Sequence, residues 1–478
     1  MKLLFVASEC APFVKTGGLA DVIGAVPKAL ANLDISVRVL IPNYPALAET
    51  ASSGQVVMSF DDLFGGPASV IAVQSEGLDL LLLDAPHLYD RSGNIYLGAD
   101  GQDWHDNDLR FAALSFVGAQ VGLEGLGEWK PDVINAHDWQ AGLVPAYLRQ
   151  DGRASPPVVM TIHNIAFQGV FDSTQLSALK LNSELFTRDG IEYFGKISFL
   201  KAGLAFAQKI TTVSPSYSAE LLSSDFGMGL DGVLRERQQD FHGILNGIDL
   251  DVWDPMTDPN LAANYSVTRL AGKKKNRLEL EARFGLAEGD GPLFCVVSRL
   301  TSQKGLDMLL DCLPDLVEQG GRLALLGSGD PHLEKAFIDA SNRYDGSVGT
   351  IIGYDENLSH LIQAGSDAIL IPSRFEPCGL TQLYGLRYGT LPIVARTGGL
   401  ADTVIDANDA GLRSNCATGF QFAPINSIMF GQAISRACRL FAKPKVWAGM
   451  MRRAMRHSVG WDQSASAYLK VYHSALER

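Results

Sequence analysis

The sequence predicts an α/β protein made of two Rossmann-like, doubly wound domains that face a central cleft. Three observations indicate this fold class. The chain has 478 residues, whereas a single hydrophobic core stops growing near about 250–300 residues. Short apolar runs alternate with helical patterns, which is typical of a parallel sheet covered on both faces. The alternation starts afresh after a stretch rich in Gly, Asn, Asp and Pro, from Asn246 to Pro255.

The first half opens with an apolar strand, Leu3 to Ser8, followed by a Gly-containing turn and a helix from about Leu19. The apolar run is too short for a signal sequence, and Glu9 and Lys15 follow it without a convincing cleavage site. We therefore expect a buried first strand. Further strands are expected at 36–42, 79–83, 132–135 and 158–161.

The second half repeats the alternation from residue 246 onward. A helix is expected at 307–317, among strands at 294–298, 323–326, 350–352, 368–371 and 392–395. In open parallel sheets, ligands bind beyond the carboxyl ends of the strands. The polar residues that follow these strands should therefore converge on the cleft between the two halves.

The amino-acid composition limits the kinds of ligand or partner that the protein is expected to bind. The formal net charge is −13 and the isoelectric point is near 5.2, which argues against a nucleic-acid or anionic-membrane surface because both need a basic footprint. The six cysteines form no Cys-x-x-Cys pair, so reduced thiols in a cytoplasmic protein are expected. A neutral glucan would not be repelled, whereas an anionic ligand must be held by a few local Lys and Arg side chains.

The first candidate site is the turn Lys15-Thr16-Gly17-Gly18, which places a cation and two glycines before a helix. Glycine allows close approach of a ligand, and a helix N-terminus favours anions. A plain tight turn explains the glycines equally well. The turn matches neither Gly-x-Gly-x-x-Gly nor a Walker sequence, which disfavours NAD binding and ATP hydrolysis. A similar segment, 396–403, recurs in the second half.

The second candidate site combines two loops of the second half. Arg299 and Lys304 stand on one short loop and could neutralise a diphosphate. Glu376 precedes a helix whose first N–H groups, near Leu380 and Thr381, could bind phosphate oxygens. A solvated basic loop and a helix-capping carboxylate are the alternatives.

Two histidines follow successive strands of the first half, in His137-Asp138-Trp139-Gln140 and His163-Asn164. Such residues suit sugar recognition, although an isolated His is more often simply packed. Trp139 and Tyr96 could stack on glucose, with burial in the core as the alternative. The Asp249-Leu250-Asp251 segment superficially resembles an Asp-x-Asp metal motif, and no metal is expected.

Seven stretches together resemble the bacterial glycogen synthase and plant starch synthase family, and they run through nearly the whole chain in the family's order: 15–22, 137–140, 161–164, 246–249, 299–305, 373–380 and 397–400. Length and the lack of a transit peptide favour the bacterial branch. The resemblance implies the two-domain GT-B architecture, no metal or other cofactor, and ADP-glucose as donor with an α-1,4-glucan as acceptor. It also implies domains at 1–245 and 246–456, and a helix at 457–478 that crosses back to the first domain.

The resemblance also assigns roles to residues. Those expected to act in catalysis are Arg299, Lys304, Glu376, His163 and Asp138. Those expected to bind substrate are Lys15, Gly17, Gly18, Asp21, Tyr96, Trp139, Asn164, Asn246, Cys378, Gly379, Leu380 and Thr381. Two departures from the family pattern are Asn135, where His is common, and Asp34-Ile35, where a Gly-containing turn is usual.

The expected activity is a retaining transfer of glucose by same-face attack, since the sequence shows no convincing carboxylate pair of the glycosidase kind. A sugar-nucleotide epimerase and a non-catalytic glucan- or nucleotide-binding protein are the alternatives. Incubation with ADP-glucose and a glucan primer separates the three.

Overall fold

The computed structural model describes residues 1–477, which divide into two compact units. The first unit is Met1–Asn246 together with the segment that begins at Trp461, and the second is Gly247–Gly460. The chain passes between the units at 246/247 and again at 460/461, whereas the boundaries expected from the sequence are 245/246 and 456/457. No helix among residues 1–477 is long and apolar enough to span a membrane.

A nine-stranded sheet forms the centre of the first unit, in the order β12-β11-β7-β6-β1-β2-β5-β4-β3. Its strands are β1 (Lys2–Val6), β2 (Ser36–Pro42), β3 (Gln55–Phe60), β4 (Ala68–Ser75), β5 (Leu78–Asp84), β6 (Val133–His137), β7 (Val158–Ile162), β11 (Lys209–Thr212) and β12 (Phe241–Gly243). All five predicted strands are present. The pairs from β12 to β5 are parallel, whereas β3 and β4 form an antiparallel edge.

Helices cover this sheet, and a small antiparallel sheet of β8 (Val170–Asp172), β10 (Lys196–Ser198) and β9 (Glu192–Tyr193) extends the unit. The helices are α1 (Gly18–Ala31), α2 (Ala48–Ser52), α3 (Pro86–Tyr89), α4 (Asn107–Glu124), α5 (Val144–Asp151), α6 (Phe199–Phe206), α7 (Pro215–Glu220), α8 (Asp231–Glu236) and α18 (Asp462–Leu476). Helix α1 buries an apolar stripe at helical spacing, Leu19, Val22, Ile23, Val26 and Leu30.

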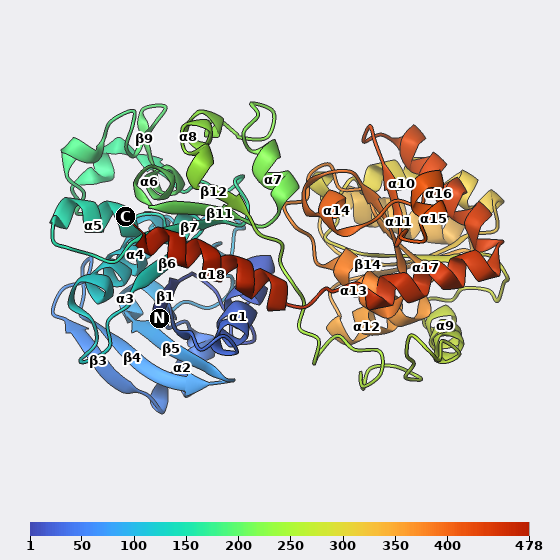
Figure 1. Cartoon of the computed structure of the whole chain (residues 1–478), viewed down its shortest axis with the longest axis horizontal. Coiled ribbons are helices and arrows are strands. Elements are labelled where there is room, and N and C mark those ends of the chain that lie inside the picture. The colour runs from blue at the N-terminus through green and yellow to red at the C-terminus, as the bar shows by residue number, and fades with distance from the viewer. Residues whose placement is uncertain (478) are drawn as a thin grey trace. The chain divides into compact units, whose positions relative to one another are not determined.

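The C-terminal helix α18 packs against α1 and β6, and Figure 1 shows it in red alongside them. The hydroxyl of Tyr472 on α18 donates to Oδ1 of Asn135, 2.7 Å away. The amide of Asn135 in turn donates to the carbonyl of Val159 and to Oγ1 of Thr161. The departure at Asn135 is therefore accommodated within the core, because its amide joins β6, β7 and α18.

The second departure, at Asp34, keeps the backbone that glycine usually supplies. Asp34 adopts a φ of 58° in the turn between α1 and β2. Asp is one of the residues that tolerate the left-handed region. The turn therefore survives the loss of glycine.

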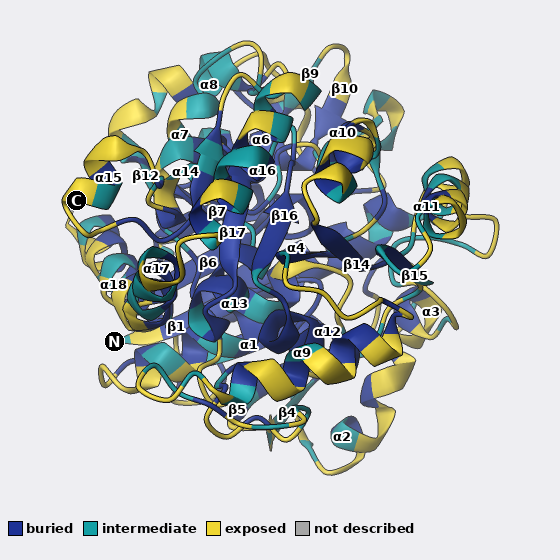
Figure 2. Cartoon of the chain, turned by 90° about the vertical axis from the view of Figure 1, so that its right-hand side faces the viewer, coloured by how far each residue is buried: buried dark blue, intermediate teal, exposed yellow. Residues whose placement is uncertain are grey.

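A six-stranded parallel sheet forms the centre of the second unit, in the order β15-β14-β13-β16-β17-β18. Its strands are β13 (Leu293–Val297), β14 (Arg322–Gly327), β15 (Val348–Ile352), β16 (Ala368–Ile371), β17 (Leu391–Ala395) and β18 (Phe420–Phe422). The five predicted strands are β13 to β17. Figure 2 shows β14, β16 and β17 buried, while the outer faces of α9 and α11 are exposed.

The helices of the second unit lie on both faces of this sheet. They are α9 (Gly272–Arg283), α10 (Leu306–Glu318), α11 (Pro331–Arg343), α12 (Glu356–Gly365), α13 (Thr381–Tyr388), α14 (Gly398–Thr403), α15 (Asp409–Arg413), α16 (Ser427–Phe441) and α17 (Pro444–Arg456). The sheet separates two buried apolar clusters, one of them around α10, α13, α16 and α17 and the other around α9 and α12. The predicted fold class, two doubly wound α/β units, is confirmed.

The segment that opens the second unit is fixed by a polar and aromatic cluster. Trp253 stacks between the rings of His360 and Tyr384, with centroid distances of 3.7 and 3.6 Å. Oδ2 of Asp258 accepts hydrogen bonds from Nδ1 of His360 at 2.7 Å and from the hydroxyl of Tyr388 at 2.5 Å. These contacts hold 247–265 against α12 and α13.

Candidate active site

The Lys15–Gly18 turn follows β1 and leads into α1, and all four of its residues are exposed. A Cβ placed on Gly17 or on Gly18 would meet no atom within 4 Å. Gly17 has a φ of −160°, which any residue can adopt. Neither packing nor backbone strain therefore requires these glycines, and the space beside them is open to the close approach of a ligand. Lys15 forms an exposed ion pair of 2.8 Å with Asp21 on the first turn of α1.

Glu9 holds this turn in place through hydrogen bonds. Its carboxylate accepts the backbone N–H of Thr16 at 2.5 Å and the hydroxyl of Thr16 at 3.0 Å. It also accepts the hydroxyl of Tyr96 at 3.1 Å, and that hydroxyl lies 2.7 Å from Oγ of Ser8. Burial raises the pKa of Glu9, against the opposing effect of the Thr16 hydrogen bonds. The half-buried Tyr96 thus helps to hold Glu9.

His137 and His163, at the ends of β6 and β7, form a buried pair. Nδ1 of His137 lies 3.0 Å from Nε2 of His163, and the rings are tilted by 34°. Burial lowers the pKa of His163 to about 3, and burial followed by repulsion from His163 lowers that of His137 well below its usual value. Both imidazoles are therefore neutral near pH 7, and one ring donates to the other.

Asp138 connects the two strand ends. Its Oδ1 accepts the backbone N–H of His163 at 2.7 Å, and its φ is 52°, an unusual conformation for a non-glycine residue. Burial raises the pKa of Asp138 to about 7, despite the backbone hydrogen bonds that oppose this shift. A carboxyl group with such a pKa can hold or release a proton near neutrality.

The remaining predicted residues of the first unit differ in accessibility. Trp139 is only 9 % exposed and packs edge-on against Phe111 at 4.9 Å. Its ring packs in the core, which is the alternative given for it from the sequence, and its role in binding sugar stays a prediction. Asn164 is partly exposed, and its Oδ1 accepts the N–H of Ala166. The buried Oδ1 of Asn246 has no hydrogen-bond partner within residues 1–477.

In the second unit, backbone contacts join the loop after β13 to the loop after β16. The N–H of Arg374 donates to the carbonyl of Gln303 at 2.8 Å, and the amide of Gln303 donates to the carbonyl of Phe375 at 3.1 Å. The guanidinium of Arg374 also donates to the carbonyl of Ser302. The side chain of Arg299, on the first of these loops, is exposed. The two predicted loops therefore lie side by side, as parallel-strand topology requires.

Lys304 and Glu376 meet where these loops join. Nζ of Lys304 lies 2.5 Å from Oε2 of Glu376, and the hydroxyl of Ser373 donates to the same oxygen at 2.9 Å. The Lys304 and Glu376 side chains are 19 % and 10 % exposed. The pair is thus partly desolvated but still open to a ligand, and exchange of Glu376 for an incoming anion would leave Lys304 neutralised.

The glycine-rich 397–400 segment presses against the Glu376 loop. The N–H of Gly399 donates to the carbonyls of Glu376 and Pro377, at 3.2 and 3.1 Å. A Cβ on Gly398 would lie 2.0 Å from the Glu376 carbonyl oxygen, so this glycine is required by packing. The two similar segments therefore differ: the glycines of 397–400 are packed against the Glu376 loop, whereas those of 15–18 face open space.

The loop from Glu376 ends at α13. Cys378 is buried, whereas Gly379, Leu380 and Thr381 are partly exposed and lead into the first turn of the helix. Gly379 adopts a φ of 72°, in the region that favours glycine. The first N–H groups of this helix can donate hydrogen bonds to phosphate oxygens.

Sequence reasoning missed two polar residues of these two groups, namely Glu9 and Ser373. Glu9 has a partner, Tyr96, that is remote in sequence, and the Ser373 side chain is buried. Position alone was a usable signal for Glu9, which follows the carboxyl end of the parallel strand β1. The predicted convergence of the two groups on one cleft stays a prediction.

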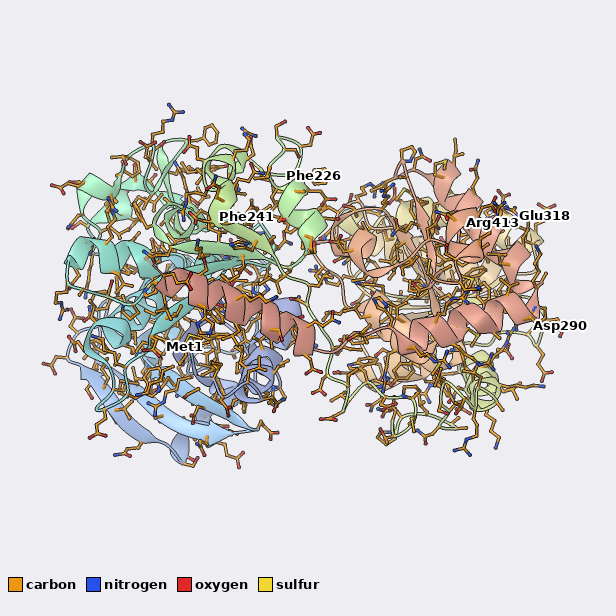
Figure 3. The ribbon with its side chains drawn as sticks, in the orientation of Figure 1. Met1, Phe226, Phe241, Asp290, Glu318 and Arg413 are labelled. Carbon is orange, nitrogen blue, oxygen red and sulfur yellow. The ribbon has the colours of Figure 1, made fainter. Side chains whose placement is uncertain are left out.

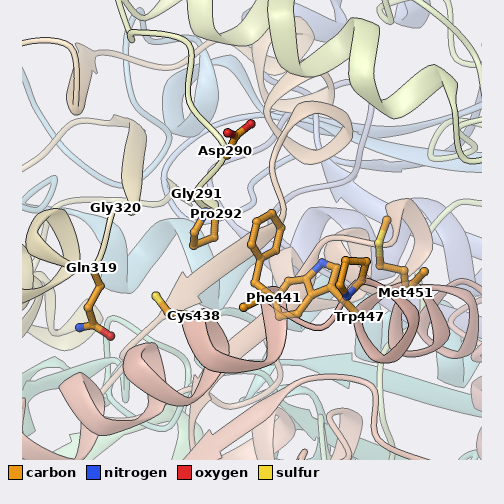
Figure 4. Close-up of a pocket in the computed structure, with 12 residues that line it drawn as sticks. Asp290, Gly291, Pro292, Gln319, Gly320, Cys438, Phe441, Trp447 and Met451 are labelled. Atoms are coloured by element: carbon orange, nitrogen blue, oxygen red, sulfur yellow. The ribbon is translucent and has the colours of Figure 1, made fainter.

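The position of two cavities can be compared with that of the predicted site residues. One, of about 280 Å³, is lined by Val14 and Ile95, the neighbours of Lys15 and Tyr96. The other, of about 630 Å³, lies in the second unit and contains no predicted site residue. Figure 4 shows Pro292, Phe441 and Trp447 grouped along its wall.

Among residues 1–477, no group of three or more His, Cys, Asp or Glu side chains could hold a metal ion. Asp249 instead accepts the N–H of Asp251, as a turn residue does.

Comparison with known proteins places these features in context. Residues 2–236 match the model of the starch synthase catalytic domain, and residues 279–446 match that of glycosyl transferases group 1. A glycogen synthase of Roseobacter denitrificans is 63 % identical over 477 residues and covers all of both chains. One of Paracoccus denitrificans is 54 % identical, with 99 % of each chain covered. The catalytic domain of Arabidopsis thaliana starch synthase IV, solved with ADP and acarbose, has 31 % identity and a TM-score of 0.88, covering 100 % of this chain and 99 % of that one.

Proposed function

The chain belongs to the glycogen and starch synthase family of glycosyltransferases, and from this we propose that it transfers glucose from ADP-glucose to the non-reducing end of an α-1,4-glucan, with retention of configuration. The observation that carries this proposal is the Lys304–Glu376 pair beside the start of α13. It provides a cation, a sugar-binding carboxylate and helix N–H groups in one place. The relative solved with ADP and acarbose supports an adenine nucleotide as the donor.

Most of the contacts to the donor would come from the second unit. Arg299 and Lys304 would neutralise the diphosphate, and the N–H groups near Leu380 and Thr381 would bind its oxygens. Glu376 would then be released from Lys304 to accept hydroxyls of the transferred glucose. Charge that grows on the departing ADP is stabilised by groups already in position, and each such contact contributes on the order of 10²–10³ in rate.

The first unit would supply the acceptor side. The oxygen of the acceptor 4-hydroxyl forms a bond to C1 of the donor glucose as the bond from C1 to the phosphate oxygen breaks. The hydroxyl proton passes to the departing phosphate on the same face. The neutral His163 and Asn164 would hydrogen-bond sugar hydroxyls, while Lys15 and the open turn at Gly17 and Gly18 would meet the diphosphate.

The deciding experiment incubates the protein with ADP-glucose or UDP-glucose, a maltooligosaccharide primer and a chelator. Growth of the primer with release of ADP in the presence of the chelator supports the proposal, including transfer without a metal. A new sugar isomer would instead indicate an epimerase, and binding without release of nucleotide would indicate a non-catalytic protein. Faster transfer from UDP-glucose would overturn the choice of donor.

A further inference from the structure

Three loops of the first unit bring exposed apolar side chains together around the small β8-β10-β9 sheet. We define the apolar platform as Phe167, Tyr193, Phe194 and Met228. Phe194 is 81 % exposed, Phe167 59 % and Met228 41 %. Isolated exposed apolar residues are common, but a group of them, three on neighbouring loop tips, marks a binding surface.

Side-chain hydrogen bonds to one carbonyl hold these loops together. The carbonyl oxygen of Met228 accepts the hydroxyl of Tyr193 at 2.7 Å and the side-chain amide of Gln168 at 3.0 Å. A Cβ on Gly229 would lie 3.3 Å from Cε2 of Phe194, so that ring lies against the Met228–Gly229 backbone. Figure 3 labels Phe226, two residues before Met228 on this loop.

Phe194 occupies a backbone position that disfavours it. The turn between β9 and β10 has two central residues, Phe194 and Gly195, with φ values of 49° and 78°. Turns with two positive φ values strongly prefer Asn-Gly or Asp-Gly. A bulky aromatic residue at the first position is an outlier that costs stability and persists where the structure uses it.

Met228 repeats the same arrangement on a second loop. Met228 and Gly229 have φ values of 47° and 80°. Two adjacent loops therefore each present an exposed apolar side chain from a left-handed residue followed by glycine. Asn is the favoured residue at such positions, so neither apolar side chain is explained by the stability of its turn.

We propose that the apolar platform binds an α-glucan chain beyond the reacting end, which rests on the function proposed above. Aromatic rings suit the apolar faces of glucose units, and none of the four side chains carries a charge that a neutral polymer would have to desolvate. The platform is also continuous with the acceptor residues: Phe167 is three residues after Asn164, and its N–H donates to the Asn164 carbonyl at 3.2 Å.

A second copy of the chain fits the platform less well. Each aromatic side chain can bury about 150–250 Å², and the four are only partly exposed. Their sum stays well below the roughly 800 Å² that each partner of a standard interface buries. A flexible sugar polymer needs no such area, because it can make weak contacts at several points.

The test uses Phe194→Asn, which removes the ring and creates the favoured Asn-Gly turn. Retardation in a glycogen-containing gel and the KM for glycogen report on binding. We expect affinity for glycogen to fall about five- to tenfold, with kcat at saturation and the KM for ADP-glucose unchanged and Tm equal or higher. Met228→Asn should act in the same direction. Met256→Asn, at a loop residue of the second unit that is 60 % exposed, is the matched control and should bind as the wild type does.

Glycogen binding within twofold of the wild type in both platform variants would overturn the proposal. So would a change of sedimentation mass with unchanged glycogen affinity, which would assign the surface to a second copy. If the wild type transfers no glucose but its glycogen binding still depends on Phe194, the platform stands and the proposed reaction fails. If glucose transfer is normal and glycogen affinity does not depend on Phe194, only the proposal for the platform is refuted.

Discussion

Nζ of Lys304 lies 2.5 Å from Oε2 of Glu376, so the cation proposed for the diphosphate is held in advance by the carboxylate proposed for the sugar. Such a pair orders both side chains before any ligand binds. If one of the two side chains is removed, the charge of the other is left without a partner at a mostly buried position. The two proposed roles are therefore coupled.

Lys304→Ala should lower kcat with ADP-glucose by about 10²–10³, since a charge contact to the leaving group would be lost. Glu376→Gln should lower it similarly while keeping the volume of the side chain. Steady-state kinetics at saturating donor provide the measurement. Lys335→Ala is the control, because Lys335 forms an exposed pair with Asp339 on α11. Near-normal turnover in either active-site variant would refute the assigned role.

Gly17→Ala should leave Tm unchanged, because the added Cβ meets nothing within 4 Å. It should nevertheless raise the KM for ADP-glucose, by about tenfold for a displaced charged hydrogen bond. Gly232→Ala on α8 is the control, since its Cβ also meets nothing within 4 Å; it should leave the KM unchanged, with Tm equal or higher because Ala favours a helix over Gly. An unaltered KM in Gly17→Ala would show that the open turn does not approach the donor.

Glu9→Gln tests a residue whose role the sequence did not predict. An amide can accept the Thr16 N–H but loses the charge that strengthens three hydrogen bonds. We expect the KM for the donor to rise about three- to tenfold, from loss of about 1 kcal/mol of turn stabilisation, with a smaller change in the KM for glucan. Glu49→Gln, at an exposed position of α2, is the control. Equal effects on both substrates would indicate general loss of structure.

Asp138→Asn should reveal the raised pKa of Asp138, about 7, in the pH dependence of stability. Between about pH 4 and pH 7 the folded protein keeps a proton that the unfolded chain has lost. Raising the pH through this window therefore lowers the free energy of unfolding of the wild type, by up to about 1.4 kcal/mol per pH unit. The variant lacks this ionisation.

The free energy of unfolding of Asp138→Asn should thus rise relative to that of the wild type as the pH rises. Urea unfolding at about pH 5 and about pH 7 measures it. The histidines titrate in both proteins, so their contribution cancels in the comparison. A difference that does not change with pH would contradict the raised pKa.

The central strands were predictable because both faces of a parallel sheet are covered, which makes strands such as β13 and β16 continuous apolar runs. The antiparallel edge was not, since β3 is half exposed and lacks such a run. Loop residues at strand ends were also predictable. The difference between Trp139, which packs in the core, and Phe194, which is exposed, depends on long-range packing that local pattern does not contain.

The contact between Asn135 and Tyr472 has a consequence for biosynthesis. The first unit is discontinuous in sequence, and its last helix, α18, is made after the whole of the second unit. Until then the buried amide of Asn135 lacks the hydrogen bond from Tyr472, and the surface that α18 covers stays exposed to solvent. On the ribosome, the second unit can therefore finish folding first, while the first unit must wait until α18 has been made.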